Sequence, residues 1–422
     1  MDRRQFTRML AGGASAWLLA SQAEAWQRAT ALAETPSVPD ERFWRSVREQ
    51  FLLPEDLAVM NAANLCPSPA PVLQALYDAT RDIDRDPSPR NRRKMSDGKE
   101  ATRHLLADYL HVTPEEVVIT RNTSEGNNIV SSGLDLKAGD EVIIFGDNHP
   151  SLHVAWRDKA ARFGFTVRIV DQANPHPGPE YYLDAFKKQL TSRTKVVAFS
   201  HLSNTVGDLL PAKELCSLAR EHGAMSVVDG AQTFGLFDLD LSDMKPDFFT
   251  GSAHKWPCGA REAGLLYVNS RVHDRIWPSI ISLYAGAVGI SRKLEALGQR
   301  DEATIIAFGE ALKFQMKVGM KAIEARSREL AAGLIAGLSR LDGVRMWTHA
   351  DPTRSAAVVS FQPGNLDPSK LSEALQGQHG IVGMPRSGND RPGLRLSPHF
   401  FNLPGEVERT IAAVQRYLKT GL

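Results

Sequence analysis

The sequence predicts an α/β protein: a large domain with a mostly parallel sheet flanked by helices, followed by a smaller α+β C-terminal domain. Short apolar runs alternate with helix-period segments between residues 117 and 268, and a long helical pattern follows from residue 302 to about 341. Strand-like and helix-like segments are mixed beyond it. The chain has 422 residues, of which 42% are hydrophobic, and this is enough for two domains with separate cores.

Seven apolar runs mark the expected strands of the large domain. They are residues 117–120, 141–145, 166–170, 195–200, 225–229, 248–251 and 264–268. Helix-period segments such as 182–190 and 212–222 lie between several of them, with Pro211 and Gly223 at positions typical of a helix start and end. In sheets of this kind, ligands bind beyond the carboxyl ends of the strands.

The pattern also divides the C-terminal part. The helical segment 302–341 has a weak point at Gly319 and indicates one or two connecting helices. The small domain is expected to contain a strand at 356–361, a helix at 368–378, a strand at 394–397 and a final helix from about residue 404. The predicted domain division is 1–25 signal, 26–40 linker, 41–66 a segment packing with the small domain, 67–305 large domain and 306–422 small domain.

The N-terminus has the layout of an export signal. Arg3 and Arg4 precede Phe6, a mildly apolar segment follows at 9–20, and Ala23-Glu24-Ala25 offers a cleavage site. The paired arginines resemble a twin-arginine (Tat) signal. An amphipathic opening helix is the alternative, but no helical face emerges. We therefore expect Tat-dependent export to the periplasm, with cleavage near Ala25.

Charge and hydropathy argue against nucleic acid and membranes as partners. The net charge of +1 gives no basic field for nucleic acid or an anionic membrane, and no mature stretch is long and apolar enough to span a bilayer. The three scattered cysteines form no disulfide framework. His149 and His153 are spaced i, i+4, but without an adjacent glutamate or a third ligand we expect no metal site.

Two strand ends carry the chemistry. Asp229 ends the run 225–229, Gln232 follows it, and Lys255 follows the run 248–251. Alone, an aspartate there is usually a turn residue and a lysine a surface residue. Together they are what pyridoxal phosphate chemistry needs, because a lysine bonds to the aldehyde and an acid keeps the pyridine nitrogen protonated.

Other polar residues stand at neighbouring strand ends. Thr123 and Ser124 open a probable helix, which is compatible with an anion site, although taken alone they are better explained by an ordinary helix cap with a polar first turn. Ser252 and His254 precede Lys255 and are candidates to bind the phosphate. Arg395, on an expected strand, suits either a substrate carboxylate or a structural salt bridge. Thr123, His149, Asn204, Asp229 and Lys255 are all expected to face one crevice.

Taken together, the motifs resemble the class V aminotransferase family of fold type I pyridoxal phosphate enzymes, and within it the isopenicillin N epimerase-like branch. The resemblance covers roughly residues 61–402. It is carried by Asn61-Ala62-Ala63, Arg121-Asn122-Thr123-Ser124-Glu125-Gly126, Asp147-Asn148-His149-Pro150, Ser203-Asn204-Thr205-Val206-Gly207, Asp229-Gly230-Ala231-Gln232, Ser252-Ala253-His254-Lys255, Gly298-Gln299-Arg300-Asp301 and Arg395-Leu396-Ser397-Pro398-His399.

The resemblance implies a role for each residue. Lys255 is the cofactor lysine, Asp229 and Gln232 hold the ring, and His149 stacks on it. Thr123, Ser124, Ser252 and His254 hold the phosphate, while Asn64, Asn204 and Arg395 meet the substrate. The family's homodimer is also implied, with Gln299 in place of a threonine that reaches the partner's phosphate. Residues 381–391 lack the desulfurase cysteine, so no persulfide relay is expected.

We therefore expect a pyridoxal phosphate enzyme that acts at the α carbon of an amino acid or of an amino-acid unit in a larger metabolite, by epimerisation or transamination. Cysteine-independent β-elimination (a C–S lyase) and a non-catalytic pyridoxal phosphate or amino-acid sensor are the alternatives. Export suggests tailoring of a peptide natural product such as a siderophore. The Tat translocase is then a transient partner.

Overall fold

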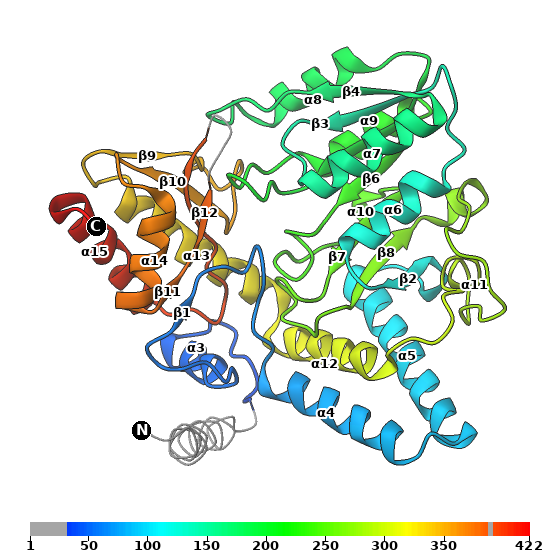
Figure 1. The fold of residues 1–422 in the computed structure, drawn as a ribbon, viewed down its shortest axis with the longest axis horizontal. Helices are drawn as coiled ribbons and strands as arrows, with labels where there is room; N and C mark the ends of the chain where they lie inside the picture. Colours follow the sequence, from blue (N-terminus) through cyan, green and yellow to red (C-terminus); the bar gives the residue numbers. More distant parts are fainter. Residues whose placement is uncertain (1–31, 387–390) are drawn as a thin grey trace, which may run out of the picture.

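The computed structural model describes residues 32–386 and 391–422. The predicted signal and the first part of the predicted linker lie outside the described residues. The described chain forms a large α/β domain and a smaller C-terminal domain with its own sheet (Figure 1). No described helix has the length and apolar character needed to cross a bilayer.

A seven-stranded sheet forms the centre of the large domain. Its strands are β2 (Val117–Thr120), β3 (Glu141–Phe145), β4 (Thr166–Val170), β5 (Thr194–Ser200), β6 (Met225–Asp229), β7 (Phe248–Ser252) and β8 (Gly264–Val268). They lie in the order β2-β8-β7-β6-β5-β3-β4; β8 is antiparallel to both of its neighbours, β2 and β7, and the other neighbouring strands are parallel. The predicted strands and the mostly parallel sheet are confirmed, with strand ends correct to within one residue.

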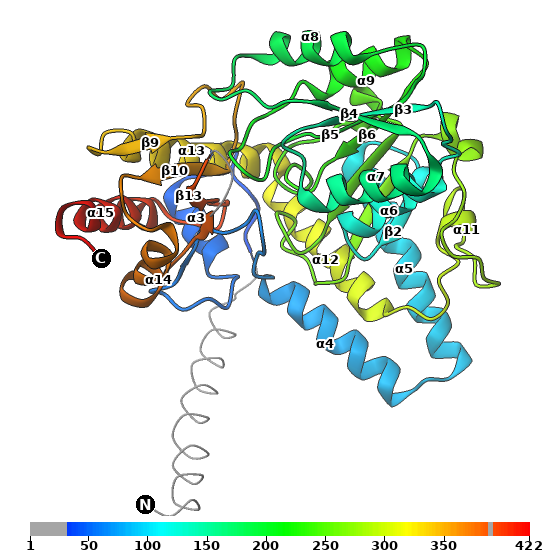
Figure 2. The ribbon, with the colours of Figure 1, turned by 45° about the horizontal axis from the view of Figure 1, so that its top comes forward.

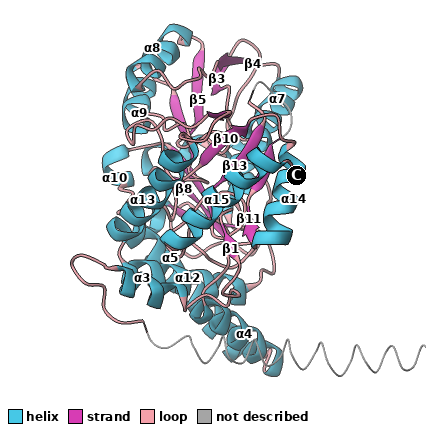
Figure 3. Ribbon diagram, turned by 90° about the vertical axis from the view of Figure 1, so that its left-hand side faces the viewer, coloured by secondary structure: helices cyan, strands magenta, loops and turns pink. Residues whose placement is uncertain are grey.

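Helices cover both faces of this sheet (Figure 3). They are α6 (Thr123–Gly133), α7 (Pro150–Phe163), α8 (Pro179–Gln189), α9 (Ala212–Glu221) and the short α10 (Leu241–Met244). Along β3, Val142 and Ile144 join one buried cluster with α6 and α7 residues, whereas Ile143 and Phe145 join another with α8 and α9 residues. Because side chains alternate along a strand, the continuous apolar runs follow from burial on both sides.

Long helices flank the large domain and lead into the small one (Figure 2). They are α4 (Ala70–Arg85), α5 (Pro89–Leu110), α12 (Glu302–Val318) and α13 (Met320–Leu338), and α12 packs against α4 and α5. The expected break at Gly319 is confirmed: this residue has φ 89°, which a glycine adopts without strain, and it separates α12 from α13. Between β8 and α12 lie the 3-10 helix η3 (Ser270–Arg275) and α11 (Ser291–Leu294), and η2 (Pro114–Glu116) precedes β2.

The small domain has a four-stranded antiparallel sheet in the order β12-β13-β10-β9. Its elements are β9 (Val344–Met346), β10 (Val359–Pro363), α14 (Pro368–His379), β11 (Ile381–Val382), β12 (Met384–Arg386), β13 (Gly393–Leu396) and α15 (Pro404–Thr420). The strand expected at 356–361 begins at Val359 instead, since the buried residues before it form no ladder with β13. The N-terminal segment contributes α3 (Glu41–Arg48) and β1 (Ala58–Val59), which pairs with β11.

Candidate active site

A cavity of about 460 Å³ lies beyond the carboxyl ends of the central strands, between the large domain and the small-domain strands β12 and β13. Ten of the twelve predicted site residues line it: Asn64, Thr123, Ser124, His149, Asn204, Asp229, Ser252, His254, Lys255 and Arg395. A larger hollow between α3 and the start of α15 contains none of them. We therefore assign the candidate active site to the smaller cavity.

Lys255 and Asp229 reach this cavity from adjacent strands. β6 and β7 are parallel, with Asp229 beside Thr250, and Lys255 follows three residues after the end of β7. Burial lowers the pKa of Lys255 to about 8, with the Asp229 charge opposing and the Arg395 charge adding to the shift. The amine therefore loses its proton far more readily than that of an exposed lysine, as a nucleophile or proton acceptor requires.

Trp256, the residue after Lys255, makes hydrogen bonds with three side chains from different parts of the chain. The indole Nε1 of Trp256 donates to Gln232 Oε1 at 2.8 Å. Its carbonyl accepts from Gln315 Nε2 of α12 at 2.7 Å and makes a 2.7 Å hydrogen bond with His399 Nε2 of the small domain. Contacts from both domains therefore fix the position from which Lys255 projects.

Asn127 positions Asp229 and was missing from the sequence-based prediction. Its Nδ2 donates to Asp229 Oδ2 at 3.1 Å, while its Oδ1 accepts from Thr250 Oγ1 at 3.0 Å. The other Asp229 oxygen accepts from the Ala231 amide at 3.0 Å. Asn127 lies one helical turn after Thr123, so the i, i+4 spacing was the available signal.

The start of α6 provides an anion site. Asn122 caps the helix, its side chain accepting from the Glu125 amide at 3.0 Å. Ser252 Oγ accepts from the Thr123 amide at 2.9 Å and lies 2.8 Å from Thr123 Oγ1. Hydroxyls and a helix N-terminus at one end of the cavity suit a phosphate group.

Two histidines of the cavity favour the neutral ring. Burial and the neighbouring Lys255 lower the pKa of His254 to about 4. Burial and Lys255 also lower the pKa of His149, which caps α7 and has Nδ1 2.7 Å from Ser151 Oγ. A neutral His149 ring on the cavity wall is compatible with stacking on a flat cofactor.

Arg395 is buried on β13 and has only neutral partners among the described residues. Its NH1 donates to the Asn204 carbonyl at 2.8 Å and its NH2 to Asn61 Oδ1 at 3.1 Å. Burial, followed by the charge of nearby Arg386, lowers its pKa to about 9. Of the two roles suggested by the sequence, this environment favours binding an anion over a structural salt bridge.

Gln232 and Gln299 lie outside the cavity wall. Gln232 is buried behind it, where Nε2 donates to the Ala63 carbonyl at 3.0 Å. Gln299 lies beyond α11, and its Oε1 accepts from Arg92 at 3.1 Å. A reach of Gln299 into a partner's site stays a prediction.

The cysteines take no part in the cavity. Cys66, Cys216 and Cys258 are all free and buried, and none lines the cavity. Where the desulfurase pattern calls for a cysteine-bearing loop, the described cavity wall has Met384, Pro385 and Arg386.

Comparison with known proteins identifies the family. Residues 66–389 match the family described as Aminotransferase class-V. Isopenicillin N epimerase of Amycolatopsis lactamdurans is 30% identical over 394 residues, which cover 89% of this chain and 99% of that protein. Cysteine desulfurase of Synechococcus elongatus is 31% identical over 351 residues, covering 78% of this chain and 54% of that protein.

Solved structures agree on the fold. The apo cysteine desulfurase of Thermococcus onnurineus superposes with a TM-score of 0.82 at 24% identity, over 92% of this chain and 100% of that one. A C-DES mutant with glycine covalently linked to its pyridoxal phosphate cofactor gives a TM-score of 0.81 at 23% identity, over 90% and 99%. The predicted fold type I architecture is confirmed.

Proposed function

This chain belongs to the class V aminotransferase family, and on that basis we propose that it is a pyridoxal phosphate enzyme acting at the α carbon of an amino acid or of an amino-acid unit in a larger metabolite, by epimerisation or transamination. One observation carries the proposal. Lys255, Asp229 and Arg395 line a single cavity that also contains the N-terminus of α6. These supply an amine, an acid, a carboxylate-binding group and a phosphate site.

The residues present fit the cofactor. The side-chain oxygen of Asn204 and the Nε of Arg395 are buried without a partner among the described residues, although both belong to residues of the cavity wall. Buried polar atoms rarely stay unpaired, so a bound polar group is the fitting counterpart. The hydroxyls of Thr123, Ser124 and Ser252 suit the phosphate, and Asp229 suits the pyridine nitrogen.

Bound pyridoxal phosphate supplies an aldehyde and an electron-withdrawing ring. The protein supplies the remainder. Arg395 holds the α-carboxylate of the substrate in a fork of N–H donors. Lys255, whose pKa is about 8, takes the α proton and returns it. Asn127 and the Ala231 amide hold the Asp229 carboxylate in place.

The place to which the proton returns distinguishes the reactions. Return to the opposite face of the α carbon inverts it, which is the reaction named by the epimerase relatives. A second candidate is β-elimination without a cysteine nucleophile, as in a C–S lyase. It is favoured by the absence of cysteine from the described cavity wall. Measuring inversion, keto-acid release and sulfide release on one substrate panel distinguishes epimerisation, transamination and β-elimination.

We place the enzyme in the periplasm, exported by the Tat system. The basis is the Arg3-Arg4 pair ahead of the small-residue site at Ala25. A periplasmic amino-acid enzyme encounters exported peptides, so tailoring of a peptide natural product such as a siderophore is the proposed role. Cell fractionation of wild type and the double change Arg3→Lys, Arg4→Lys tests the location; wild type remaining in the cytoplasm contradicts it.

The central test is Lys255→Ala. The wild-type protein purified with pyridoxal phosphate should show an absorbance band at the edge of the visible range from the lysine-bound cofactor, and the variant should lose this band. Lys213→Ala is the matched control, because Lys213 is exposed and forms a surface ion pair with the exposed Asp243. A band that survives in Lys255→Ala, or is missing from reloaded wild type, contradicts the proposal.

Exchange of the α proton distinguishes an enzyme from a sensor. In heavy water, wild type should exchange the α proton of at least one amino acid, and Lys255→Ala should not, because the proton acceptor is gone. Binding without exchange across a broad panel favours the sensor.

A further inference from the structure

The small domain contributes two arginines to one face of the cavity. In the β12–β13 ladder, Met384 lies opposite Arg395 and Arg386 lies opposite Gly393. Side chains alternate along a strand, so Arg386 shares the face of Met384 and hence that of Arg395. Met384, Arg386 and Arg395 all line the cavity. Two guanidinium groups therefore enter it from neighbouring positions.

Neither guanidinium has an anionic partner among the residues that the structure describes. Arg395 meets only the Asn204 carbonyl and the Asn61 amide oxygen. Arg386 is half-buried and makes no hydrogen bond or ion pair with any described residue. Burial lowers the pKa of both groups, and the charge of Arg386 adds to the shift at Arg395. The cavity thus holds two cations that disfavour each other.

Asp147, the acid whose charge favours the protonated form of Arg386, already has other partners. Asp147 forms an ion pair with Arg391 at 3.1 Å. It also accepts hydrogen bonds from the hydroxyls of Ser203 and Thr205. Asp147 is therefore shared among these partners, and it makes no hydrogen bond or ion pair with Arg386. Arg386 is half-buried and has no direct ion-pair partner among the described residues, which costs free energy that a ligand carboxylate recovers on binding.

We propose that Arg386 is a specificity-determining residue that binds a carboxylate on the side chain of the substrate, while Arg395 binds the α-carboxylate. The substrate class is then an amino acid, or an amino-acid unit of a larger molecule, with an acidic side chain. This rests on the proposed function, since it assumes an amino-acid substrate in this cavity. Arginine suits the task because its planar fork matches a carboxylate.

The positions of the two arginines divide the roles. Arg395 is buried and held by two neutral oxygens, so its orientation is fixed before a ligand arrives. Arg386 is on β12, the edge strand of the small-domain sheet, and is more exposed. The fixed, buried Arg395 suits the α-carboxylate, which all amino acids share. The more exposed Arg386 suits a side-chain carboxylate, which only some amino acids carry.

The experiment titrates the loaded enzyme with L-glutamate, L-aspartate, L-glutamine and L-asparagine and follows the change in cofactor absorbance. Wild type should bind each acid at least about tenfold more tightly than its amide, as expected for one charge-assisted pair. Arg386→Met should remove that preference by weakening the acids only. Arg386→Lys should restore part of it, and Met384→Ala, which alters the same wall without a charge, should keep it.

The outcomes separate the two levels of the proposal. Equal binding of acids and amides by wild type overturns the acidic-substrate inference and leaves the α-carbon enzyme intact. Equal weakening of all four compounds in Arg386→Met also overturns it, because Arg386 then shares the α-carboxylate or only supports the wall. No absorbance response with any of the four, together with no α-proton exchange across the broad amino-acid panel in wild type, contradicts the proposed function itself.

Discussion

The lowered pKa of Lys255 makes its reactivity testable without the cofactor. The neutral amine is the reactive form, so reaction should rise with pH and level off above about pH 8. An exposed lysine continues to gain about tenfold per pH unit up to about 10.4. We expect site-resolved mass spectrometry of the apoprotein, treated with trinitrobenzenesulfonate, to show this difference between Lys255 and Lys213.

Arg395→Met supplies the matched variant for this pH profile. The Arg395 charge contributes to lowering the Lys255 pKa, so its removal should move the midpoint to higher pH. A Lys255 profile that coincides with that of Lys213 in wild type contradicts the assigned environment.

Site residues could be predicted from the sequence where they end or closely follow a predicted strand. Asp229 and Lys255 needed only the strand pattern and the rule that sites lie beyond carboxyl ends. Asn127 and Arg386 were missed because their roles depend on contacts between elements. Asn127 reaches Asp229 across 102 positions of sequence. Arg386 faces the cavity only because β12 pairs with β13.

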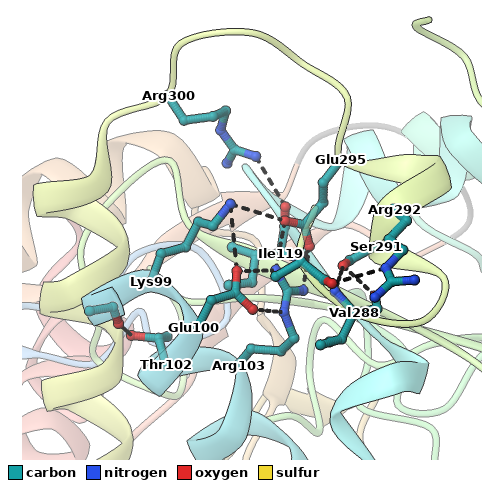
Figure 4. A network of polar contacts seen from close by, with 12 residues as sticks. Lys99, Glu100, Thr102, Arg103, Ile119, Val288, Ser291, Arg292, Glu295 and Arg300 are labelled. Carbon is teal, nitrogen blue, oxygen red and sulfur yellow. Dashed lines mark hydrogen bonds and ion pairs between the residues drawn. The ribbon is translucent and has the colours of Figure 1, made fainter. Parts of the chain in front are cut away.

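At the scale of elements, a buried ion-pair network fixes the segment between β8 and α12 (Figure 4). Arg103 of α5 pairs with Glu295 at 2.5 Å, and both side chains are almost fully buried. Glu295 Oε1 also accepts from the amide of Ile119 in β2 at 2.6 Å. A helix, a strand and the α11 segment therefore meet at one carboxylate, close to Gln299 and Arg300.

Glu295→Gln should lower the free energy of unfolding by about 3 kcal/mol, because the buried Arg103 guanidinium then loses the negative charge of one ion-pair partner. Glu100, 2.8 Å from Arg103 Nε, limits the loss. The control is Glu310→Gln, in an exposed pair with Lys313, which should cost at most about 0.5 kcal/mol. Urea unfolding measures both, and equal losses contradict a structural role for the buried pair.

Strands were predicted correctly where a continuous apolar run reflects burial on both faces of the sheet, as in β2 to β8. The long helical pattern around Gly319 was likewise sufficient to predict the break between α12 and α13. β12 went unrecognised, since Met384-Pro385-Arg386 is short, contains a proline and shows no alternation. A proline is tolerated there because β12 is an edge strand. Such a strand exists only through its tertiary partner.

At the scale of the whole molecule, the surface has one exposed apolar segment next to Gln299. Trp277, Ile281 and Leu283 are 66%, 86% and 99% exposed. Tyr284, 69% exposed, lines the same hollow as Gln299. Contiguous exposed apolar side chains of this kind mark interaction surfaces. We predict that this segment forms the interface of the homodimer implied by the resemblance, with Gln299 close to the partner subunit.

Leu283→Asp should convert the dimer to a monomer, because a charge in an apolar interface is buried without a partner. Sedimentation velocity should give nearly twice the chain mass for wild type and the single-chain mass for the variant. Val154→Asp, 55% exposed on α7, is the control and should stay dimeric. If Gln299 reaches the partner's phosphate, Leu283→Asp should also weaken pyridoxal phosphate binding, and Gln299→Ala should do so without changing the mass. A monomeric wild type, or a dimer that survives Leu283→Asp, contradicts this interface.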